Sequence, residues 1–381
     1  MEQSVQIQRV RQAFEYIDSD TTATGEGVRR TPIGNYTSTE WQAREVATLF
    51  KKYPLFMGLS GVIAEPGDYV ALEHATTPIL LVRGDDGVAR AFINMCRHRG
   101  APVANGCGRA ESFVCRYHAW RYDRAGQLRG LPDKRNFPGI ALSDHGLVPL
   151  PLEEHHGMLW VLPDPEGRLE LDAYLAGLNP ELGSYRLGSY GHYERRVLHR
   201  DINWKMPIDT FLEPYHFASL HTNTVAPIFY PNICLFEGHG PHHWMAVARK
   251  SIESLRDQPE NEWDFVKHTA ISYQLFPNTI VTMQADHVET WRVFPVRGRV
   301  DQCVIYFDCY VPEPVTSDKA KRYWDANIDL AIRTVDAEDI AIQAEMERNF
   351  LSGAMADMLI GQNEPALAHF HLALERAMAE G

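Results

Sequence analysis

The stretch CRHRGAPVANGCGRAESFVCRYH, residues 96–118, decides how the N-terminal part of this chain folds. It carries one Cys and one His at each end, Cys96 with His98 and Cys115 with His118. Because each pair lies just beyond a predicted strand, we expect two loop tips that hold one object between them. Two thiolates and two imidazoles can bind either a tetrahedral zinc ion or a [2Fe-2S] cluster in which the cysteines hold one iron and the histidines the other.

The spacing of these residues favours the cluster over the zinc ion. Structural zinc sites usually take a Cys-x-x-Cys knuckle or a His pair from one loop, whereas each loop here supplies one residue of each kind. Histidine ligands raise the reduction potential of such a cluster to about −150 mV or higher, so an ordinary ferredoxin can reduce it. A zinc ribbon is the alternative interpretation.

Outward from this motif, residues 41–165 have the pattern of a small antiparallel β domain. Short apolar runs at 79–82, 91–95 and 157–162 alternate there with turn signals. We expect residues 1–40 to form a helical segment that packs on a larger C-terminal domain.

Residues 166–381 are predicted to form that larger domain, which is of the α+β class. Its strands are expected mostly in hairpin order, at 192–198, 244–249, 279–284, 289–294 and 303–310. The stretch 317–350 combines many charges with apolar residues at helical spacing, which predicts one or two long amphipathic helices that close over a sheet.

A second group of metal-binding residue types occurs at Asp209, Glu213, His216 and His221. The first three are four and three residues apart, so a helix would place them on one face. Pro214 interrupts such a helix, and the five-residue step between the histidines predicts a kink or a π-bulge. Two histidines on one element and a carboxylate from elsewhere form the facial triad of non-haem Fe(II) oxygenases, which leaves positions open for O2 and substrate.

Both groups of residues resemble a known family. CRHRG at 96–100 and CRYHAWRYDRAGQL at 115–128 are similar to the Rieske signature of ring-hydroxylating oxygenases, and NWKMPIDTFLEPYHFASLH at 203–221 resembles the iron-binding stretch of the same family. The resemblance implies an N-terminal all-β Rieske domain and a C-terminal helix-grip domain, which is an antiparallel sheet with a long C-terminal helix.

The resemblance also implies which residues hold metal. In that family the two cysteines of the signature bind one iron of the cluster and the two histidines bind the other. Carried over to this chain, the cluster ligands are Cys96 and Cys115 on one iron, and His98 and His118 on the other. His216 and His221 carry over as ligands of a mononuclear Fe(II).

The third ligand of the mononuclear iron has to come from far along the chain, because no acid near His221 completes the set. In relatives it is the Asp of a Glu-Asp pair on the C-terminal helix, and EDIAIQAEMERNFLSG at 338–353 looks similar, which implies Asp339. Asp336 is the next candidate. A salt-bridged carboxylate on a helix surface is the alternative interpretation.

Two acids near the histidines also have implied roles. In the family, the acid three residues before the first iron-binding His bridges to a Rieske His of the neighbouring subunit in a head-to-tail trimer. Here that acid is Glu213, where many relatives have Asp, and the implied electron route runs from His118 through Glu213 of the adjacent chain to His216. Asp209 stands where many relatives have Asn, and it is expected either to support the site or to be a solvated helix carboxylate.

Together these residues predict a terminal oxygenase component. Hydroxylation with O2 consumes two electrons from outside the substrate, which one Fe(II) cannot supply alone. No Gly-x-Gly-x-x-Gly follows a predicted strand, so NAD(P)H would act only through a reductase or ferredoxin partner. We expect mono- or dioxygenation, or oxidative demethylation, of a small aromatic or alkylamine substrate by a homotrimer. The alternative is a Rieske-type electron carrier or a ligand-binding protein without oxygenase chemistry.

Apolar residues after His221 and on the sheet are candidates for the walls of a substrate pocket, or else for the core. They are Phe217, Ile228, Phe229, Phe236, Trp244 and Trp291. Aromatic walls suit a planar apolar substrate and equally a methylated ammonium group.

The composition argues against several classes of protein. The net charge is −13, so no basic footprint for nucleic acid or an anionic membrane is present. No apolar run of about 18 residues occurs, and the start MEQSVQIQRVRQAF lacks the apolar core of a signal peptide, so we expect a cytoplasmic protein with reduced thiols. The cysteines outside the motif are predicted to be ordinary thiols; they are Cys107, Cys234, Cys303 and Cys309.

Overall fold

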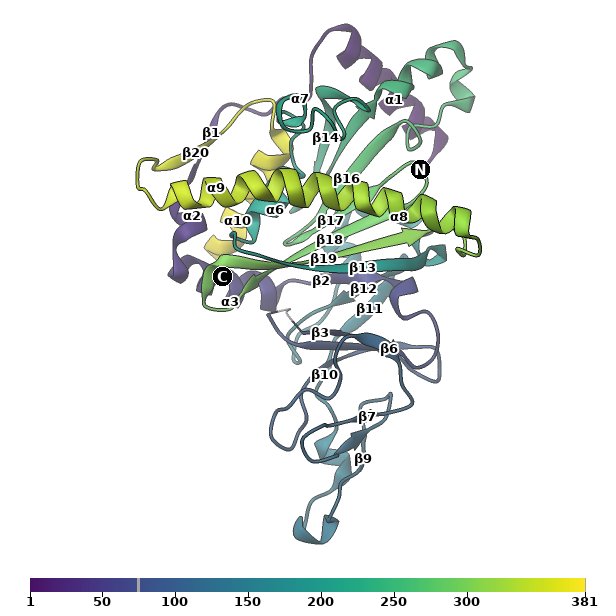
Figure 1. Cartoon of the computed structure of the whole chain (residues 1–381), viewed down its shortest axis with the longest axis vertical. Coiled ribbons are helices and arrows are strands. Elements are labelled where there is room, and N and C mark those ends of the chain that lie inside the picture. Colours follow the sequence, from purple (N-terminus) through teal and green to yellow (C-terminus); the bar gives the residue numbers. More distant parts are fainter. Residues whose placement is uncertain (74–75, 381) are drawn as a thin grey trace. The chain divides into compact units, whose positions relative to one another are not determined.

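The computed structural model of the chain describes residues 1–73 and 76–380, which divide into two compact units (Figure 1). The small unit consists of Val46–Leu171 and Leu187–Gly191. The large unit consists of Met1–Glu45, Asp172–Arg186 and the chain from His192 onward. Each unit is described by itself.

The small unit is built from short antiparallel strands in three sheets. One sheet has five strands in the order β10-β5-β4-β3-β6, a second has the order β11-β12-β2, and the third has the order β7-β8-β9. The strands are β2 (Leu55–Leu59), β3 (Asp68–Leu72), β4 (Ile79–Arg83), β5 (Ala89–Ile93), β6 (Cys107–Arg109), β7 (Phe113–Val114), β8 (Arg121–Tyr122), β9 (Leu128–Gly130), β10 (Pro149–Leu150), β11 (Leu152–His155) and β12 (Met158–Val161).

The hairpin between β4 and β5 shows why this region forms a sheet. All five residues of β4 are buried, in keeping with its nearly continuous apolar sequence. The chain then turns at Gly87, whose φ of 75° lies in the left-handed region that glycine adopts without strain. The N–H of Gly84 donates to the carbonyl oxygen of Val88 at 2.9 Å and closes the turn. One hydrophobic core lies beneath these strands, and it includes both Cys96 and Cys115.

The large unit contains a seven-stranded sheet in the order β13-β19-β18-β17-β16-β15-β14. From β14 to β19 each strand pairs antiparallel with the next, as expected for a chain of hairpins. The strands are β13 (Gly191–Arg200), β14 (Phe229–His239), β15 (His242–Arg249), β16 (Thr269–Leu275), β17 (Thr279–Met283), β18 (Val288–Val296) and β19 (Arg299–Val311). A separate pair joins β1 (Arg29–Pro32) and β20 (Asp357–Ile360).

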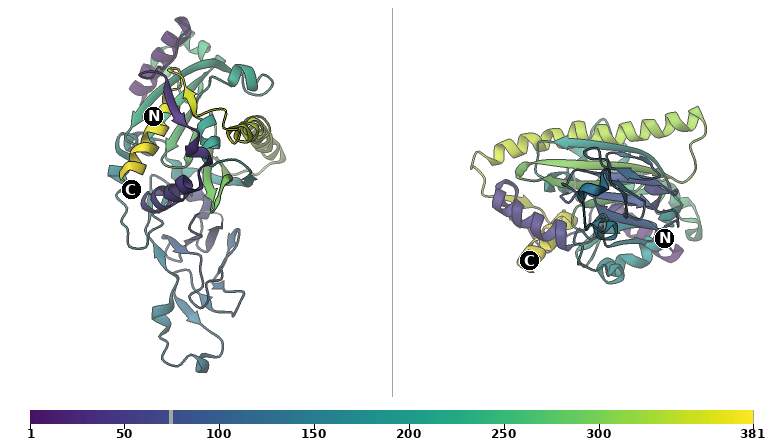
Figure 2. Two further views of the ribbon diagram at one scale, coloured as in Figure 1. Left: turned by 90° about the vertical axis from the view of Figure 1, so that its left-hand side faces the viewer. Right: turned by 90° about the horizontal axis from the view of Figure 1, so that it is seen from below.

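One long helical rod lies across a face of this sheet (Figures 1 and 2). It begins with α8 (Asp318–Ile332), continues as a π-helix (Arg333–Ile340) and ends with α9 (Ala341–Phe350). The hydroxyl of Ser317 caps its start by accepting a hydrogen bond from the N–H of Ala320 at 3.2 Å.

The remaining helices are short except for those near the chain ends. The α-helices are α1 (Gln3–Asp18), α2 (Gly34–Thr37), α3 (Thr39–Lys52), α4 (Leu171–Leu175), α5 (Asn179–Ser184), α6 (Lys205–Thr210), α7 (Phe217–Leu220) and α10 (Pro365–Glu380). The 3-10 turns are η1 (Ser60–Ile63), η2 (Lys134–Asn136), η3 (Leu142–His145), η4 (Ala176–Leu178), η5 (Leu187–Ser189), η6 (Lys250–Asp257) and η7 (Glu260–Glu262).

Helix α1 is held on the large unit by a buried cation. The guanidinium of Arg9 pairs with Glu181 at 2.7 Å and lies 3.7 Å from the centroid of the Trp244 ring. A planar guanidinium suits both contacts at once, because it can form a bidentate ion pair while stacking on an aromatic face.

The α+β fold class, with an all-β N-terminal part and an antiparallel sheet under a long C-terminal helix, is confirmed. The predicted helices at 317–350 form one continuous rod. Two strands of the large sheet, β14 and β16, were not predicted. Within the described part of the chain, no helix has both the length and the apolar character that crossing a membrane requires.

Candidate metal centres

Two loops of the small unit share one pattern of backbone hydrogen bonds, and each carries a Cys–His pair. In the first loop the N–H of Cys96 donates to the carbonyl oxygen of Ala101 at 2.8 Å. In the second, the N–H of Cys115 donates to the carbonyl oxygen of Trp120 at 2.9 Å. Each cysteine is thus bonded to the residue five positions later, so the two loops curve in the same way.

A second matched bond requires a left-handed residue in each loop. Gly100 donates its N–H to the carbonyl oxygen of Cys96, and Ala119 donates to that of Cys115, each at 2.9 Å. The φ angles of these two donors are 80° and 56°. Glycine adopts this conformation freely, whereas alanine does so at a cost of about 1 kcal/mol, which the surrounding contacts of Ala119 have to offset.

The Cys and His side chains of the two loops converge. Both cysteine side chains are free thiols and buried, and the ring centroids of His98 and His118 lie 4.5 Å apart. Burial raises the pKa of the Cys96 thiol, and the adjacent Cys115 thiol adds to the increase. The His98 ring stacks on Trp120 at 5.0 Å, and its Nδ1 is buried without a hydrogen-bond partner among the described residues.

These observations fit a Rieske cluster. A buried imidazole nitrogen without a partner is costly unless it binds something, and two sulfur and two nitrogen donors are the ligand set of a [2Fe-2S] cluster of this type. The hydroxyl of Tyr122 lies 3.3 Å from Cys96 Sγ and accepts the N–H of Arg97 at 3.0 Å. Burial raises the pKa of Tyr122, so the phenol stays neutral and can donate its proton to a metal-bound sulfur, an interaction that tunes the potential.

In the large unit, two histidines and one carboxylate converge on one point. The Nε2 atoms of His216 and His221 lie 3.1 Å apart. The Oδ1 atom of Asp339 lies 3.1 Å from Nε2 of His221 and 3.5 Å from that of His216. Ligands at right angles around an ion, with bonds of about 2.1 Å, lie about 3 Å apart. The three atoms therefore have the separation that one divalent ion requires.

Carboxylates behind the histidines set the orientation of both rings. Nδ1 of His216 is hydrogen-bonded to Glu213, and Nδ1 of His221 to Oε2 of Glu338 at 2.6 Å. Because an ionised carboxylate only accepts, each Nδ1 carries the proton and each Nε2 keeps a lone pair. Oδ1 of Asp339 is buried and accepts no hydrogen bond from any described residue. Three lone pairs thus face one another, an arrangement that a cation stabilises.

The electrostatics of this site favour positive charge. Burial disfavours the charged form of His221, but the carboxylates of Asp339 and Glu338 outweigh that penalty and raise the pKa of His221 above its ordinary value. Histidine, carboxylate and an open side are the features of a non-haem Fe(II) site, so the residues present fit a mononuclear iron.

The histidine-bearing segment is not the single kinked helix that its spacing suggested. Helix α6 ends at Thr210 and α7 begins at Phe217, with turns between them, because Pro214 cannot donate to a helical ladder. His216 and His221 flank the single turn of α7 as its N-cap and C-cap residues. The turn brings the two rings together although five residues separate them.

The π-helix lies instead on the rod that carries the acid. Asp339 and Glu338 both belong to the π-helix Arg333–Ile340, and π-turns of this kind are frequent at functional sites. Asp336, the other predicted candidate, forms an ion pair with Arg200 at 2.6 Å, away from the histidines. The contact of Glu338 with His221 was not predicted, although Glu338 belongs to the Glu-Asp pair that drew attention to Asp339.

Asp209 belongs to α6, and its side chain takes part in a buried network rather than lying in solvent. Its Oδ2 accepts the hydroxyl proton of Tyr36 at 2.6 Å, and its Oδ1 lies 3.1 Å from Nε2 of His371. Burial and the charge of Asp209 raise the pKa of Tyr36, so Tyr36 remains a neutral donor.

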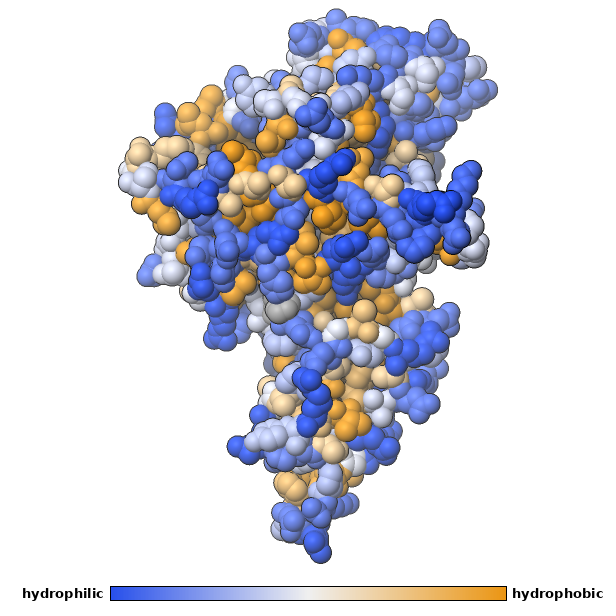
Figure 3. Space-filling view, in the orientation of Figure 1, coloured by the Kyte–Doolittle hydropathy of each residue, from blue (hydrophilic) through white to orange (hydrophobic). Residues whose placement is uncertain are grey.

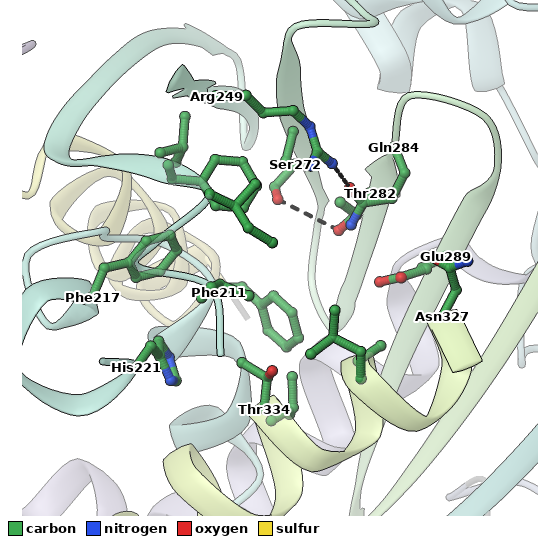
Figure 4. Close-up of a pocket in the computed structure, with 18 of the residues that line it drawn as sticks. Phe211, Phe217, His221, Arg249, Ser272, Thr282, Gln284, Glu289, Asn327 and Thr334 are labelled. Carbon is green, nitrogen blue, oxygen red and sulfur yellow. Dashed lines mark hydrogen bonds between the residues drawn. The ribbon is translucent and has the colours of Figure 1, made fainter. Parts of the chain in front are cut away.

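A cavity of about 340 Å³ adjoins the converging histidines (Figure 4). Its volume is at the small end of the range for ligand pockets. Its lining includes Glu213 and the three converging residues, and its apolar wall comprises Phe211, Phe217, Val225, Ile228, Phe229, Met245, Val247, Trp291, Leu330, Ala331 and Val335.

Four of the six predicted wall residues line this cavity, and two do not. Trp244 neighbours Met245 on β15, and since successive side chains of a strand point to opposite faces, it faces the other side, against Arg9. Phe236 packs against the rings of His243 and His369 and is not part of the cavity lining.

Comparison with known families matches both parts of the chain. The Rieske [2Fe-2S] domain family matches residues 57–148. The family of the ring hydroxylating alpha subunit (catalytic domain) matches residues 187–380, which is just over half of the chain.

Individual relatives agree with this result. The carnitine monooxygenase oxygenase subunit of Acinetobacter baumannii is 29% identical over 213 residues, which cover 55% of this chain and 57% of the relative. The large oxygenase component of the naphthalene 1,2-dioxygenase system of Ralstonia sp is 30% identical over 193 residues, covering 48% and 42%. The matched regions thus span about half the length of these curated relatives.

A solved structure shows the same fold over nearly the whole chain. The crystal structure of the quaternary ammonium Rieske monooxygenase CntA has a TM-score of 0.79 at 21% identity, covering 92% of this chain and 96% of that one. With its Rieske loops, its two-histidine-one-carboxylate group and its matched domains, this chain belongs to the family of ring-hydroxylating alpha subunits.

Proposed function

We propose that this chain is the terminal oxygenase component of a Rieske non-haem iron system, which uses O2 and external electrons to hydroxylate or demethylate a small organic substrate. The observation that carries the proposal is the convergence of two imidazole lone pairs and the orphaned Oδ1 of Asp339 beside an apolar cavity. A carrier of electrons needs no such cavity.

The proposal assigns the two metal centres to separate parts of the chain. Residues 41–165 would hold the cluster through Cys96, Cys115, His98 and His118, and residues 166–381 would hold the iron through His216, His221 and Asp339. When bound, the cluster supplies single electrons, and the iron offers open coordination positions to O2.

The side chains around the iron site perform three tasks in this proposal. The apolar wall of the cavity, which includes Phe217 and Trp291, keeps water away from the oxidising chemistry. Glu213 and Glu338 hold a proton on Nδ1 of each histidine and thereby keep each Nε2 directed at the metal. The reaction balances when O2, two electrons and two protons yield one hydroxyl group on the substrate and one water.

Electrons would arrive from a separate reductase or ferredoxin and pass between neighbouring copies of the chain. We propose a homotrimer in which Glu213 links a Rieske histidine of the adjacent copy to His216. The hydrogen bond that Nδ1 of His216 donates to Glu213 supports the half of this route that lies within one chain. Apolar side chains exposed near α9 and β20 (Figure 3) support contact with a further copy; they include Leu351, Met355 and Leu359.

The relatives suggest the range of substrates. Their names refer to carnitine, glycine betaine, salicylate and naphthalene, which include both quaternary amines and aromatic rings. Aromatic walls such as Phe211 and Trp291 accept either kind of group.

The test begins with the purified full chain under anaerobic conditions. We expect red-brown protein with a Rieske-type EPR signal and one additional iron that is lost in a His216→Ala, His221→Ala double variant while the cluster signal stays. Reduced holoenzyme mixed with O2 and a panel of aromatic acids and trimethylamines should yield a hydroxylated or demethylated product. Zinc in place of iron would refute the proposal, and a normal cluster with no iron bound by the histidine pair would favour the electron carrier.

A further inference from the structure

One wall of the cavity is polar, and the strand register builds it. Met245, Val247 and Arg249 of β15 are alternate residues on one face, and all three line the cavity. The register pairs Met245 with Ser272 on β16 and Ser272 with Thr282 on β17. A row of small hydroxyl groups therefore lies across the neighbouring strands and beside the Arg249 guanidinium.

The Arg249 guanidinium is held in place by neutral partners. Its Nη2 donates to Oε1 of Gln284 at 2.6 Å, and its Nε donates to the carbonyl oxygen of Thr269 at 3.3 Å. Its Cζ lies 4.8 Å from the centroid of the Phe229 ring. A guanidinium has five N–H donors, so these two hydrogen bonds leave it with unused donors.

Arg249 has no ion-pair partner although it is partly buried. No carboxylate of the described residues lies within 4.0 Å of its guanidinium. Burial lowers the pKa of Arg249, and the more distant charges of Asp286 and Glu289 offset only part of that effect. A buried charge without a counter-ion is expensive, and a bound anion would offset that cost.

The other charged groups on the cavity wall are already paired. His287 contacts Asp286 at 2.8 Å and Glu289 at 3.1 Å. The indole N–H of Trp291 donates to the second carboxylate oxygen of Glu289 at 3.4 Å. Glu213, His216, His221 and Asp339 are engaged at the iron site. Among the charged residues that line the cavity, all of which the structure describes, Arg249 is thus a cation with no carboxylate within 4.0 Å of its guanidinium.

We infer that this oxygenase takes substrates with a carboxylate, which binds Arg249 while the rest of the molecule extends towards the iron site. The inference rests on the proposed function. Figure 4 shows Arg249, Gln284 and Ser272 on the sheet side of the cavity, with His221 and Thr334 on the opposite side. The carboxylate would therefore hold the substrate at a distance from the position that reacts.

A cationic substrate bound at Glu289 is the competing occupant of the same cavity. His287 stands between Asp286 and Glu289, and although burial opposes its charge, these carboxylates raise the pKa of His287 to about 9. At neutral pH the positive charge of His287 is therefore shared between Asp286 and Glu289. An ammonium group would have to displace His287, whereas a carboxylate at Arg249 displaces nothing that the described residues supply.

Binding of matched carboxylate and amide probes to the iron-loaded, oxygen-free protein tests the inference by calorimetry. The probes are benzoate, 2-naphthoate and γ-butyrobetaine, each compared with its uncharged or carboxamide counterpart, and tetramethylammonium serves as a cation without a carboxylate. Because a hydrogen-bonded charge pair of this kind contributes about a factor of ten or more, at least one carboxylate should bind at least tenfold more tightly than its amide.

Substitutions of Arg249 identify the group responsible. Arg249→Gln should remove the preference for the carboxylate while leaving the affinity for the amide within about twofold, and Arg249→Lys should retain part of it. Gln284→Leu, which frees the guanidinium without removing it, should weaken carboxylate binding less than Arg249→Gln does. Arg297→Gln is the matched control, because Arg297 is exposed at the turn after β18 and lines no part of the cavity.

Two results would overturn the inference. One is a panel in which no carboxylate binds more tightly than its amide, or in which tetramethylammonium binds more tightly than every carboxylate. The other is an Arg249→Gln variant with the native melting temperature, iron content and carboxylate preference. Product formation is measured separately, so failed turnover with an intact carboxylate preference would count against the oxygenase assignment and not against this one.

Discussion

Removing the carboxylate of Glu338 should weaken iron binding without touching an iron ligand. Oε2 of Glu338 accepts two hydrogen bonds, from Nδ1 of His221 at 2.6 Å and from the hydroxyl of Thr224 at 2.7 Å. In a Glu338→Ala variant the ring of His221 loses the contact that fixes its tautomer. A protonated Nε2 cannot bind a metal, so part of the protein would be unable to hold iron until the ring rearranges.

The size of this effect follows from the contacts that remain. Loss of a carboxylate behind a metal-binding histidine typically costs about 10- to 100-fold in metal affinity, or about 1.4–2.7 kcal/mol. Asp339 still lies 3.1 Å from Nε2 of His221 and keeps the ring in place, which argues for the lower half of that range. Glu338→Gln retains an acceptor oxygen but no charge, so its loss should be smaller than that of the alanine variant.

An anaerobic titration measures the loss directly. The mononuclear site is emptied with a chelator and titrated with Co(II), whose visible bands report binding, while the absorbance of the Rieske cluster in the small unit serves as an internal control. Glu345→Ala is the matched variant, because Glu345 is an exposed acid on α9 of the same helical rod. If Glu338→Ala bound Co(II) within twofold of the wild-type affinity, the second carboxylate would have no part in orienting the histidine.

Three further predictions concern Glu213, Glu347 and the buried ion pair between Lys205 and Glu45. A Glu213→Gln variant keeps an acceptor for Nδ1 of His216, so we expect both metal centres to stay intact. Turnover should fall by about 100-fold or more, because the variant lacks the carboxylate of the electron route. Product formation at the wild-type rate would contradict that route. Burial raises the pKa of Glu347 from 4.5 to about 7, so between these pH values the folded state keeps a proton that the unfolded chain releases. The free energy of unfolding should therefore fall by about 2–3 kcal/mol between pH 4.5 and 7. Urea titrations of a Glu347→Gln variant should lack this decrease. A Lys205→Met variant leaves the buried carboxylate of Glu45 without the ammonium group that lies 2.7 Å from it, and should lose about 3–5 kcal/mol of unfolding free energy. In a double-mutant cycle, adding Glu45→Leu should largely restore the stability, because no unpaired charge then remains buried.

The strands that sequence predicted differ from those that it missed in how their residues are buried. β19 reads as an apolar run from Cys303 to Val311, because all of these positions are buried and only Asp308 among them is charged. β16 has the sequence TAISYQL, in which buried polar residues such as Gln274 conceal the strand pattern. β14 contains Pro231 and Gly238, which weaken a strand signal, and both are tolerated because β14 is the edge of the sheet.

The candidate site was predictable where a short motif carries the chemistry, and unpredictable where strands from distant parts of the chain meet. His216, His221 and Asp339 were identified because the short stretches that carry them resemble those of a known family, and the structure brings their ligand atoms together. The cavity wall depends on which face each strand residue presents, so Trp244 was a wrong candidate and its neighbour Met245 was overlooked. No local sequence pattern marked Arg249, because its proposed role depends on having no carboxylate within 4.0 Å, which only the folded structure shows.

The position of the π-helix explains how two consecutive acids serve the same histidine. In a regular α-helix, neighbouring residues point in directions about 100° apart, so Glu338 and Asp339 would not be expected to reach opposite edges of one ring. Here Glu338 contacts Nδ1 of His221, and Asp339 lies 3.1 Å from Nε2 of the same ring. Both carboxylates belong to the π-helix, whose wider turn makes the angle between consecutive residues somewhat smaller than in an α-helix. In the proposed iron site, this irregular turn would therefore let one rod supply both a ligand and the group that orients another ligand.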